Sequence, residues 1–379
     1  MMARLEEICA INMGQSPDSS TYNEDGNGLP FFQGNADFGE IYPAVRMWCS
    51  EPTKIAREKD ILISVRAPIG ALNIANCECC IGRGLAALTV NEDICAQEYL
   101  WHALSGKVDE LNSKGTGSTF KAINKKTLSE TEIPLPPIDE QRKIAAILDK
   151  VSDLIAKRQQ QLDKLDEMIK ARFMEIFGDS ETNTKNWRVL PMSKICSVGS
   201  SKRIYQSEQS SSGVPFWRIS DLTSLITTGT VTPELYIPEE RYKELKTQGQ
   251  VPAPGDILIT SRGTLGQCYI VKVNDRFYFQ DGMISWLSGY MDGVTPLYIS
   301  YLFTMPGFRK QIDSMQAVST VAYLSITMIK KLKVMLPDIE SQQQFASFVS
   351  KTEKTKTTIS RSLEKLETLK KALMQEYFG

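Results

Sequence analysis

The sequence has no long hydrophobic run, and this absence argues against a transmembrane helix. No apolar stretch approaches the roughly 20 residues that a helix needs to cross a bilayer. The first residues, Met1 to Glu7, also lack the basic, apolar and small-residue order of a secretion signal. With 379 residues, 42% hydrophobic and 23% charged, the composition is that of a globular protein large enough for two domains. We therefore expect a cytoplasmic protein with no membrane contact.

Histidine is almost absent, and several catalytic motifs are missing altogether. Triad chemistry would depend on His102 alone, and its position beside Leu100 and Trp101 on an expected helix favours a half-buried structural role. The sequence contains no Walker lysine loop, no G-x-S-x-G elbow, no H-E-x-x-H motif and no adenine-methyltransferase tetrapeptide. We therefore predict no catalytic residue in this chain.

Paired metal-ligand spacing is also missing, although eight cysteines are present. In a cytoplasmic chain of this length they are expected to be reduced thiols. Cys77, Cys79, Cys80 and Cys95 gather in one region, but zinc sites usually space their ligands as paired C-x2-4-C units. Small thiols alternating in an apolar strand are the preferred interpretation, so no metal site is predicted.

An excess of positive charge is missing as well. The formal net charge is −1, from 44 Lys and Arg against 45 Asp and Glu, so the whole chain gives no basic signal for nucleic acid. A local basic face can still bind DNA, and a partner protein can supply further phosphate contacts. The charge balance therefore counts only weakly against DNA binding.

What the sequence does contain is a long internal repeat with a constant offset. Ile138 maps to Ile339, a shift of 201 residues (339 − 138), and the offset holds without a gap along a whole expected helix. The repeated segments are 133–141 with 334–342, 162–165 with 363–366, and 177–178 with 378–379. Such a repeat predicts two similar globular units, each followed by a helix, and favours a protein that presents two related surfaces.

Each helix carries apolar residues at alternating steps of four and three, the spacing of a coiled-coil seam. Pro136 and Pro137 precede the first helix and Gly178 follows it, as is usual at helix ends. About 38 residues at ~1.5 Å each predict a rod of ~57 Å. The first seam comprises Ile144, Leu148, Val151, Ile155, Leu162, Leu165, Ile169 and Ile176. The second comprises Phe345, Val349, Ile359, Leu363, Leu366, Leu373 and Tyr377.

The two seams are interrupted at different positions. Arg158 and Arg172 break the first, whereas Lys356 and Lys370 break the second. Unlike breaks suit pairing of the two helices with each other, and the alternative is that these long side chains simply extend past the seam edge. We predict an antiparallel helix pair about a pseudo-twofold axis, with a globular unit at either end.

The globular units are expected to be mixed and strand-rich, which makes the predicted fold class α+β. Asp60–Val65 and Leu85–Val90 are predicted as buried strands and Glu98–Leu111 as a helix. The predicted boundaries are 1–137 for the first unit, 138–178 for its helix, 179–186 for a linker, 187–337 for the second unit and 338–379 for its helix.

Landmarks recur in the two units, with divergent segments between them. Lys59–Arg66 resembles Gly255–Arg262, and Gly28–Gln33 resembles Gly213–Arg218. Arg66 and Arg262 end their strands just before a turn, where a long cation can reach a phosphate or a guanine edge. A surface salt bridge is an equally good interpretation of either arginine. A shared frame with divergent loops is expected of two readers with different targets.

Together with Gly14-x-Ser16-Pro17, Asp60–Pro68 and Ile81–Leu85, these features resemble the specificity subunit of type I restriction–modification systems over essentially the whole chain. The resemblance implies two target-recognition domains, each reading half of a split, asymmetric site in double-stranded DNA. It implies helices that act as a spacer and dock two methyltransferase subunits. A ~57 Å rod spans at most ~17 base pairs at ~3.4 Å each.

The resemblance also implies what other subunits supply. Methyltransferase subunits would carry S-adenosylmethionine and methylate adenine, and restriction subunits would use ATP and Mg to cleave, with no cofactor in this chain. Two alternatives remain: a stand-alone DNA-binding regulator, and a coiled-coil adaptor that never touches nucleic acid. Co-purification with methyltransferase subunits separates the resemblance from both, and salt-sensitive DNA binding separates the regulator from the adaptor.

Candidate DNA contacts follow from the family pattern and from side-chain chemistry, since long polar side chains reach base edges and lysines reach phosphates. In the first unit they are Ser16, Gln33, Asn35, Arg66, Arg83, Ser118, Thr119 and Lys121. In the second they are Arg218, Ser220, Arg262, Thr264, Gln280, Ser319, Thr320 and Tyr323.

Overall fold

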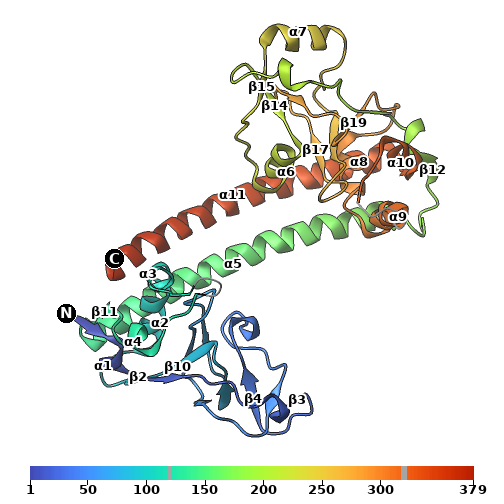
Figure 1. Cartoon of the computed structure of the whole chain (residues 1–379). Coiled ribbons are helices and arrows are strands. Elements are labelled where there is room, and N and C mark those ends of the chain that lie inside the picture. The colour runs from blue at the N-terminus through green and yellow to red at the C-terminus, as the bar shows by residue number, and fades with distance from the viewer. Residues whose placement is uncertain (118–120, 317–321) are drawn as a thin grey trace. The chain divides into compact units, whose positions relative to one another are not determined.

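A computed structural model describes residues 1–117, 121–316 and 322–379 (Figure 1). The chain forms two compact units. Unit 1 contains Met1–Gln160 and Ile359–Gly379, and unit 2 contains Gln161–Thr358. Both units mix strands with helices, which confirms the predicted α+β class. The division passes through both long helices, and the predicted limits of the globular parts stay predictions.

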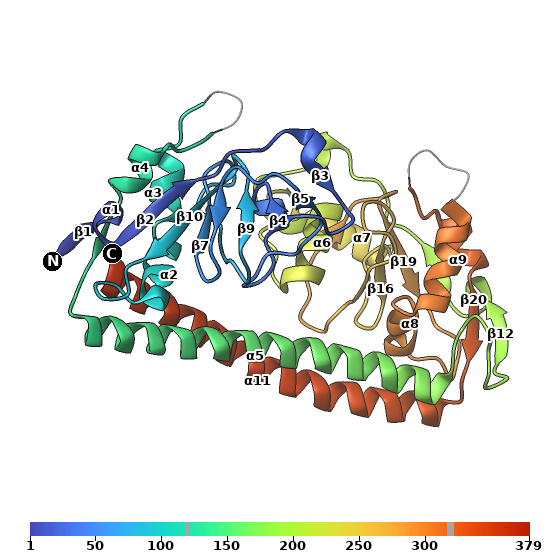
Figure 2. The same cartoon turned by 90° about the horizontal axis from the view of Figure 1, so that it is seen from below.

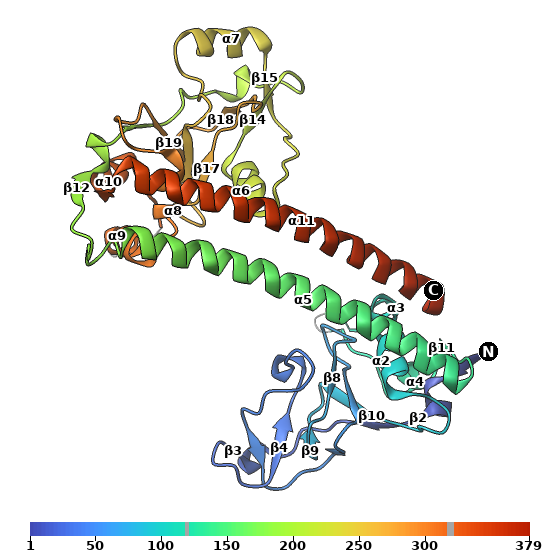
Figure 3. The ribbon, with the colours of Figure 1, turned by 180° about the vertical axis from the view of Figure 1, so that it is seen from behind.

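Unit 1 is built on two sheets. Its antiparallel sheet has the strand order β2 (Cys9–Met13), β10 (Leu85–Val90), β7 (Ile61–Ser64) and β8 (Leu72–Ile74) (Figure 2). Its second sheet has the order β3 (Tyr22–Asn23), β5 (Trp48–Cys49), β4 (Leu29–Phe32), β9 (Cys79–Ile81) and β6 (Ile55–Ala56). Figure 3 labels β3, β4 and β9 of this sheet. Every residue of β7 is buried, as expected of an apolar run covered on both faces. The predicted strands at Asp60–Val65 and Leu85–Val90 are confirmed.

Short helices and a strand pair complete the globular part of unit 1. Strands β1 (Met2–Arg4) and β11 (Glu132–Pro134) form an antiparallel pair. The helices are α1 (Leu5–Ile8), α2 (Gln97–Ser105), α3 (Val108–Ser113) and α4 (Lys125–Ser129). The prediction of one helix over Glu98–Leu111 is wrong, because α2 ends before Gly106. A glycine costs a helix about 1 kcal/mol relative to alanine, and here a side chain would lie only 3.1 Å from Met374 Cε.

Unit 2 repeats this plan with a different strand count in its second sheet. The antiparallel sheet has the order β13 (Ser197–Gly199), β19 (Ile284–Ser288), β16 (Ile257–Thr260) and β17 (Cys268–Ile270). The second sheet has the order β15 (Tyr236–Ile237), β14 (Val214–Trp217) and β18 (Tyr278–Phe279), and β12 (Arg188–Pro191) pairs with β20 (Lys333–Leu336). The shorter helices are α6 (Ile219–Thr228), α7 (Glu239–Thr247), α8 (Pro296–Leu302), α9 (Pro306–Gln316) and α10 (Ile326–Lys331).

Two long helices, α5 (Ile138–Phe177) and α11 (Ile339–Phe378), contain 40 residues each, about 60 Å at a rise of 1.5 Å per residue. In unit 1 the beginning of α5 packs in one core with the end of α11, through Leu148 and Phe378. In unit 2 the end of α5 packs with the beginning of α11, where the rings of Phe173 and Phe345 are 5.4 Å apart. Within each unit the two helices are therefore antiparallel, as predicted.

The helix seam differs from the predicted one at the end of α5. Ile176, a predicted seam residue, is only partly buried, whereas Phe173 and Phe177 are fully buried. These two rings face the globular core of unit 2 as well as α11, so they follow the core and not the heptad. None of the helices in the described ranges is long and apolar enough to cross a membrane.

Basic residues at the seam reach the opposite helix in unit 2. Lys356 of α11 forms an ion pair with Asp166 of α5, with 2.6 Å between Nζ and Oδ1. The guanidinium of Arg172 lies 6.0 Å from the centre of the Phe348 ring, within the range of a cation–π contact. Interhelical pairing therefore accounts for these two interruptions of the seam better than side chains that merely extend into solvent.

Candidate DNA-recognition surfaces

A buried glutamine fixes the start of α5 against unit 1. Gln141 is 1% exposed, and its Oε1 accepts a hydrogen bond from the backbone N–H of Ala96 at 2.9 Å. Its Nε2 donates to the backbone oxygens of Ile94 at 3.1 Å and Pro136 at 2.8 Å. The side chain thus satisfies three backbone groups, one of them in the buried residue Ala96, and removes the cost of leaving that buried donor unpaired.

Its repeat equivalent, Gln342, performs the same task at the start of α11. Gln342 is also 1% exposed, and its Oε1 accepts from the backbone N–H of Thr295 at 2.8 Å. Its Nε2 donates to Gly293 O at 2.8 Å and to Pro337 O at 3.0 Å. The Gln in the repeated entry sequence is therefore the residue that sets where each helix leaves its globular part.

The C-terminal end of each long helix packs on the globular part of the other repeat. In unit 1 the ring of Tyr99 lies 5.1 Å from that of Phe378, at the end of α11. In unit 2 the ring of Tyr298 lies 4.9 Å from that of Phe177, at the end of α5. Both tyrosine hydroxyls donate to the strand that precedes a long helix. Because Phe177 and Phe378 are equivalent in the repeat, each globular part packs on the start of its own helix and the end of the other.

A hydroxyl-anchored loop follows the central strand of each unit. Ser64 Oγ donates to Pro68 O at 2.6 Å and accepts from Ala71 N at 2.9 Å. Thr260 Oγ1 makes the same pair of contacts, at 2.5 Å to Thr264 O and 3.0 Å from Gln267 N. The loop is held from inside by one hydroxyl, so its outer residues are free to face a ligand. Arg66 and Arg262, two residues after each hydroxyl, are exposed.

Backbone hydrogen bonds join this loop to a neighbouring turn in unit 1. Val65 N donates to Gly84 O at 2.9 Å, and Gly84 N donates to Gln33 O at 3.1 Å. On the other side, Ala67 N donates to Lys121 O at 3.1 Å. The side chains of Gln33, Arg66, Arg83 and Lys121 are consequently presented from adjacent backbone segments, and all four residues are exposed.

Close backbone packing explains the glycines around Arg83. A Cβ on Gly82 would lie 2.9 Å from the Cα of Gln33, and a Cβ on Gly84 would lie 2.4 Å from the Gln33 oxygen. Only glycine fits at either position without moving the neighbouring strand. Arg83 N donates to Ser16 Oγ at 3.3 Å, which adds Ser16 to the same surface. The Gly-Arg-Gly sequence therefore holds the Arg83 turn tightly against its neighbours.

Unit 2 joins the corresponding segments through the corresponding backbone atoms. Gln280 N donates to Trp217 O at 2.9 Å and Leu324 N to Ser261 O at 3.0 Å. In unit 1 the backbone N–H groups of Gly82 and Ile123 make the corresponding hydrogen bonds. An open pocket of about 440 Å³ lies beside the loop. It is lined by Ile219, Ser220, Thr223, Arg262, Gly263 and Thr264.

Tyr323 covers one side of this surface. Its ring lies 5.5 Å from the guanidinium of Arg262, and its hydroxyl donates to Gly282 O at 2.9 Å. Arg218 differs from the other candidates, because its Nη2 donates to Glu234 at 2.7 Å and its Nε lies 3.6 Å from Asp221. The hydrogen bond to Glu234 raises the pKa of Arg218, and a DNA contact by this residue would have to displace that partner.

The structure thus gathers most predicted contact residues on one surface in each unit. Asn35 begins a short 3-10 helix next to Gly34, whose Cα lies 3.1 Å from a Cβ placed on Gly84. Four predicted residues, Ser118, Thr119, Ser319 and Thr320, lie outside the described residues. Whether any of the sixteen contacts DNA stays a prediction.

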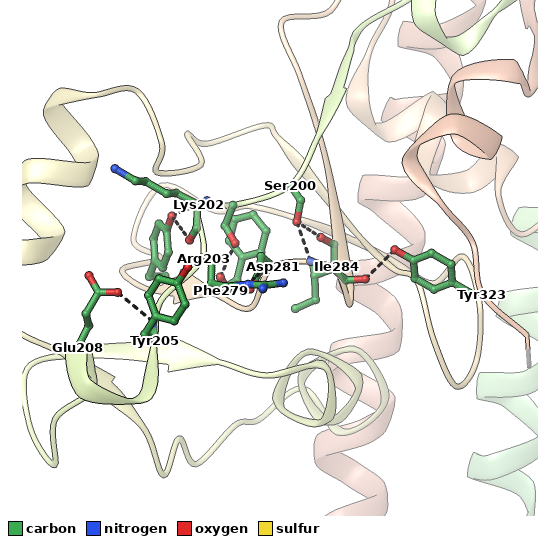
Figure 4. Close-up of polar contacts among 12 residues, drawn as sticks. Ser200, Lys202, Arg203, Tyr205, Glu208, Phe279, Asp281, Ile284 and Tyr323 are labelled. Carbon is green, nitrogen blue, oxygen red and sulfur yellow. Dashed lines mark hydrogen bonds and ion pairs between the residues drawn. The ribbon is translucent and has the colours of Figure 1, made fainter.

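A basic segment next to this surface was missed by the sequence reasoning (Figure 4). Ser200 Oγ donates to Ile284 O at 2.7 Å and accepts from Gly282 N at 3.3 Å. Two residues further on, Lys202 N donates to the Tyr278 hydroxyl at 2.9 Å. Tyr205 is 63% exposed, which is unusual for a tyrosine. The Lys-Arg-Ile-Tyr sequence at 202–205, which interleaves cations with an aromatic residue, was the signal available.

Other candidate sites have structural explanations. Cys79 and Cys80 lie in strand β9, and burial raises the pKa of the Cys79 thiol to about 12, which disfavours the thiolate that a metal requires. Within the described residues no group of three or more His, Cys, Asp and Glu side chains is arranged to hold a metal ion. His102 is 4% exposed, and its Nε2 lies 2.7 Å from Asp149 Oδ1. Its ring is thus satisfied as predicted, although more deeply buried.

Two similar units that present related cationic surfaces on a common helical frame define a duplicated binding protein. A family model described as the type I restriction modification DNA specificity domain matches residues 1–167 and 184–368. The chain therefore belongs to this family of type I restriction–modification specificity proteins, and the resemblance drawn from the sequence is confirmed.

Individual relatives agree with this family assignment. The chain is 43% identical over 180 residues to a Methanocaldococcus jannaschii protein provisionally named the specificity subunit of type I restriction enzyme MjaX. That match covers 48% of this chain and 42% of the relative, so it spans less than half of the relative's length. The chain is 18% identical over 418 residues to the EcoBI specificity subunit of Escherichia coli, with 99% and 84% of the two chains covered.

A solved structure shares the fold. The S subunit of a type I restriction–modification system from M. genitalium superimposes with a TM-score of 0.61 at 14% identity. The comparison covers 100% of this chain and 96% of that one. At this identity the likeness speaks for the fold alone.

Proposed function

We propose that this chain is the non-catalytic subunit that gives sequence specificity to a type I restriction–modification complex. Each unit reads one half of a split, asymmetric site in double-stranded DNA, and the long helices set the distance between the halves. The observation that carries the proposal is the duplicated surface. The two units hold loops and turns with the same backbone hydrogen bonds but present different side chains from them.

Within each surface the side chains divide by chemistry. Arg66, Arg83 and Arg262 are exposed at turns and can donate two parallel hydrogen bonds to a guanine edge. Lys121 is suited to phosphate, because a lysine offers a single strongly hydrated charge without a fixed direction. The open pocket beside Arg262 offers the Ser220 hydroxyl to a base edge or a phosphate.

The long helices are proposed to dock two methyltransferase subunits. On α5, Ile147 is 43% exposed, Leu154 is 37% exposed and Met168 is 51% exposed. The first two, both in unit 1, are seven residues apart and so lie on one side of the helix. Met168 is an exposed apolar residue of the part of α5 in unit 2. Apolar side chains repeated along an exposed helix face favour a protein partner.

The chemistry is proposed to come from those partners. The methyltransferase subunits would bring S-adenosylmethionine for adenine methylation, and restriction subunits would bring ATP- and Mg-dependent cleavage. This chain would contribute binding and orientation only. A stand-alone regulator and a coiled-coil adaptor remain the competing functions. The regulator would bind DNA without any methyltransferase subunit, and the adaptor would show no salt-sensitive DNA binding.

The test maps methylated adenines in DNA modified by the complex that contains this chain. We expect a split motif, and exchanging residues 1–137 for those of another family member should change one half of the motif and leave the other. Exchanging residues 187–337 is the matched control and should change the opposite half. An unsplit motif, or one that neither exchange alters, would show the proposal to be wrong.

A further inference from the structure

One difference between the duplicated turns has a compensating change elsewhere in unit 2. In both units a strand runs parallel to its neighbour and ends at equivalent residues, since Ile81 pairs with Phe32 and Phe279 pairs with Trp217. The turn that follows is Gly82-Arg83-Gly84 in unit 1 and Gln280-Asp281-Gly282 in unit 2. The middle residue is thus a cation in one unit and an anion in the other.

In unit 2 an arginine from another segment places a positive charge beside this turn. Arg203 Nε donates to Asp281 Oδ2 at 2.8 Å, so a guanidinium lies at the turn even though the turn itself carries a carboxylate (Figure 4). The side chain of Arg203 is 64% exposed and that of Asp281 is 21% exposed. The carboxylate is the sheltered partner and the guanidinium the outer one.

The segment that carries Arg203 is firmly attached behind the turn. Ser201 Oγ donates to Phe279 O at 2.7 Å, and the Tyr278 hydroxyl both donates to Lys202 O at 3.0 Å and accepts from Lys202 N at 2.9 Å. These contacts fix the backbone immediately before Arg203 against the strand that leads into the turn. The arginine therefore starts from a set position and is oriented by Asp281 at its Nε.

The two Nη atoms of Arg203 remain free for a ligand. Within the part of the chain that the structure describes, the hydrogen bond to Asp281 is made by Nε alone, and Nη1 and Nη2 have no partner. Two parallel N–H groups at the end of a guanidinium match the O6 and N7 acceptors of guanine in the major groove. A carboxylate that fixes the arginine beforehand lowers the entropic cost of that contact.

We propose that Arg203, oriented by Asp281, reads a guanine in the half-site of unit 2 and takes the place that Arg83 has in unit 1. The inference rests on the proposed function, because it names the base that one surface would recognise. An ordinary surface ion pair would also place these two side chains together, but it would have no effect on sequence preference.

The experiment compares variants of the full chain in the assembled methyltransferase complex. The complex methylates a library of duplexes in which both halves of the wild-type motif are randomised one position at a time. In the half read by unit 2, Arg203→Lys and Arg203→Ala should lose the preference for guanine at one position by roughly 5- to 150-fold. The half read by unit 1 should be unchanged. Asp281→Asn should weaken the same preference by less.

Arg276→Lys is the matched control, because Arg276 forms an exposed ion pair with Glu239 at the other end of β18; it should leave the motif intact. The inference is overturned if Arg203→Lys keeps the wild-type preference at every position, while a split motif still upholds the proposed function. It is also overturned if Arg203→Ala lowers methylation of all sequences equally, or if only Asp281→Asn changes a base. No split motif from the wild-type complex would remove the proposed function first.

Discussion

Replacing Gln342 by leucine tests whether one buried amide positions the second helix. The change keeps a similar volume but leaves the N–H of Thr295 and the oxygens of Gly293 and Pro337 without their partner. An unpaired buried donor costs about 1–3 kcal/mol, and each lost hydrogen bond to a carbonyl costs roughly 0.5–1.5 kcal/mol. We therefore expect the free energy of unfolding of unit 2 to fall by about 2–6 kcal/mol.

The assay is urea unfolding followed by segment-resolved hydrogen exchange, which separates the two units of the chain. Segments around residues 290–300 and the first turns of α11 should lose protection at lower urea, whereas segments of the unit 1 sheet should keep theirs. Gln343→Leu is the matched control, since Gln343 is exposed on the same helix. The reasoning fails if Gln342→Leu and Gln343→Leu unfold at the same urea concentration.

Three further predictions concern DNA binding and the helix contacts. Lys121→Ala should weaken binding of the complex to all sequences and reduce the slope of log affinity against log salt by about 1, with no change of motif; a changed motif would assign Lys121 to a base. His102→Ala should lower the free energy of unfolding of unit 1 by more than about 1 kcal/mol, because truncating the buried ring leaves a cavity, whereas the contact with half-exposed Asp149 contributes at most about 1 kcal/mol; calorimetry of the variant beside Ser105→Ala can test this. Phe345→Ala should cost unit 2 about 3–5 kcal/mol, whereas Lys356→Ala, which breaks a partly exposed ion pair, should cost below about 1 kcal/mol; equal losses in urea unfolding would contradict this ranking.

The helical part of the fold could be predicted because its signals are local. The prolines before Ile138 and the glycine after Phe177 each act within a few residues, and apolar spacing reports directly on a long helix. The repeat is not local, but it can be found by comparing the sequence with itself. The seam prediction was wrong at Ile176 because Phe173 and Phe177 pack in the core of unit 2, which a heptad pattern does not describe. The break at Gly106 was missed for a similar reason, since the turn there packs on Met374 from a distant part of the chain.

In the candidate site, too, features with local sequence signals could be predicted and contacts between distant residues could not. Arg66 and Arg262 could be selected from sequence because each follows a recognisable strand and precedes a turn. The sequence around Arg203 offered a signal, but the ion pair of Arg203 with Asp281 could not be predicted, since the two residues are 78 positions apart and meet only in the fold. Arg218 was selected from the family pattern and its side-chain chemistry, and its ion pairs with Glu234 and Asp221 could not be seen without the fold.

In both surfaces, the groups that fix a turn differ from the side chains that the turn exposes. In both units the fixing contacts use backbone atoms and small hydroxyls, such as Ser64 and Thr260, whereas the exposed positions carry the side chains that differ. A substitution at an exposed position should therefore alter the side chain offered to a ligand at little cost in stability, because it removes no buried contact. The difference between Arg83 and Asp281 shows that equivalent turns can carry side chains of opposite charge. The turn in unit 2 carries a carboxylate where the turn in unit 1 carries a guanidinium. Arg203 supplies a cation there because the hydrogen bonds of its segment hold that segment beside the turn.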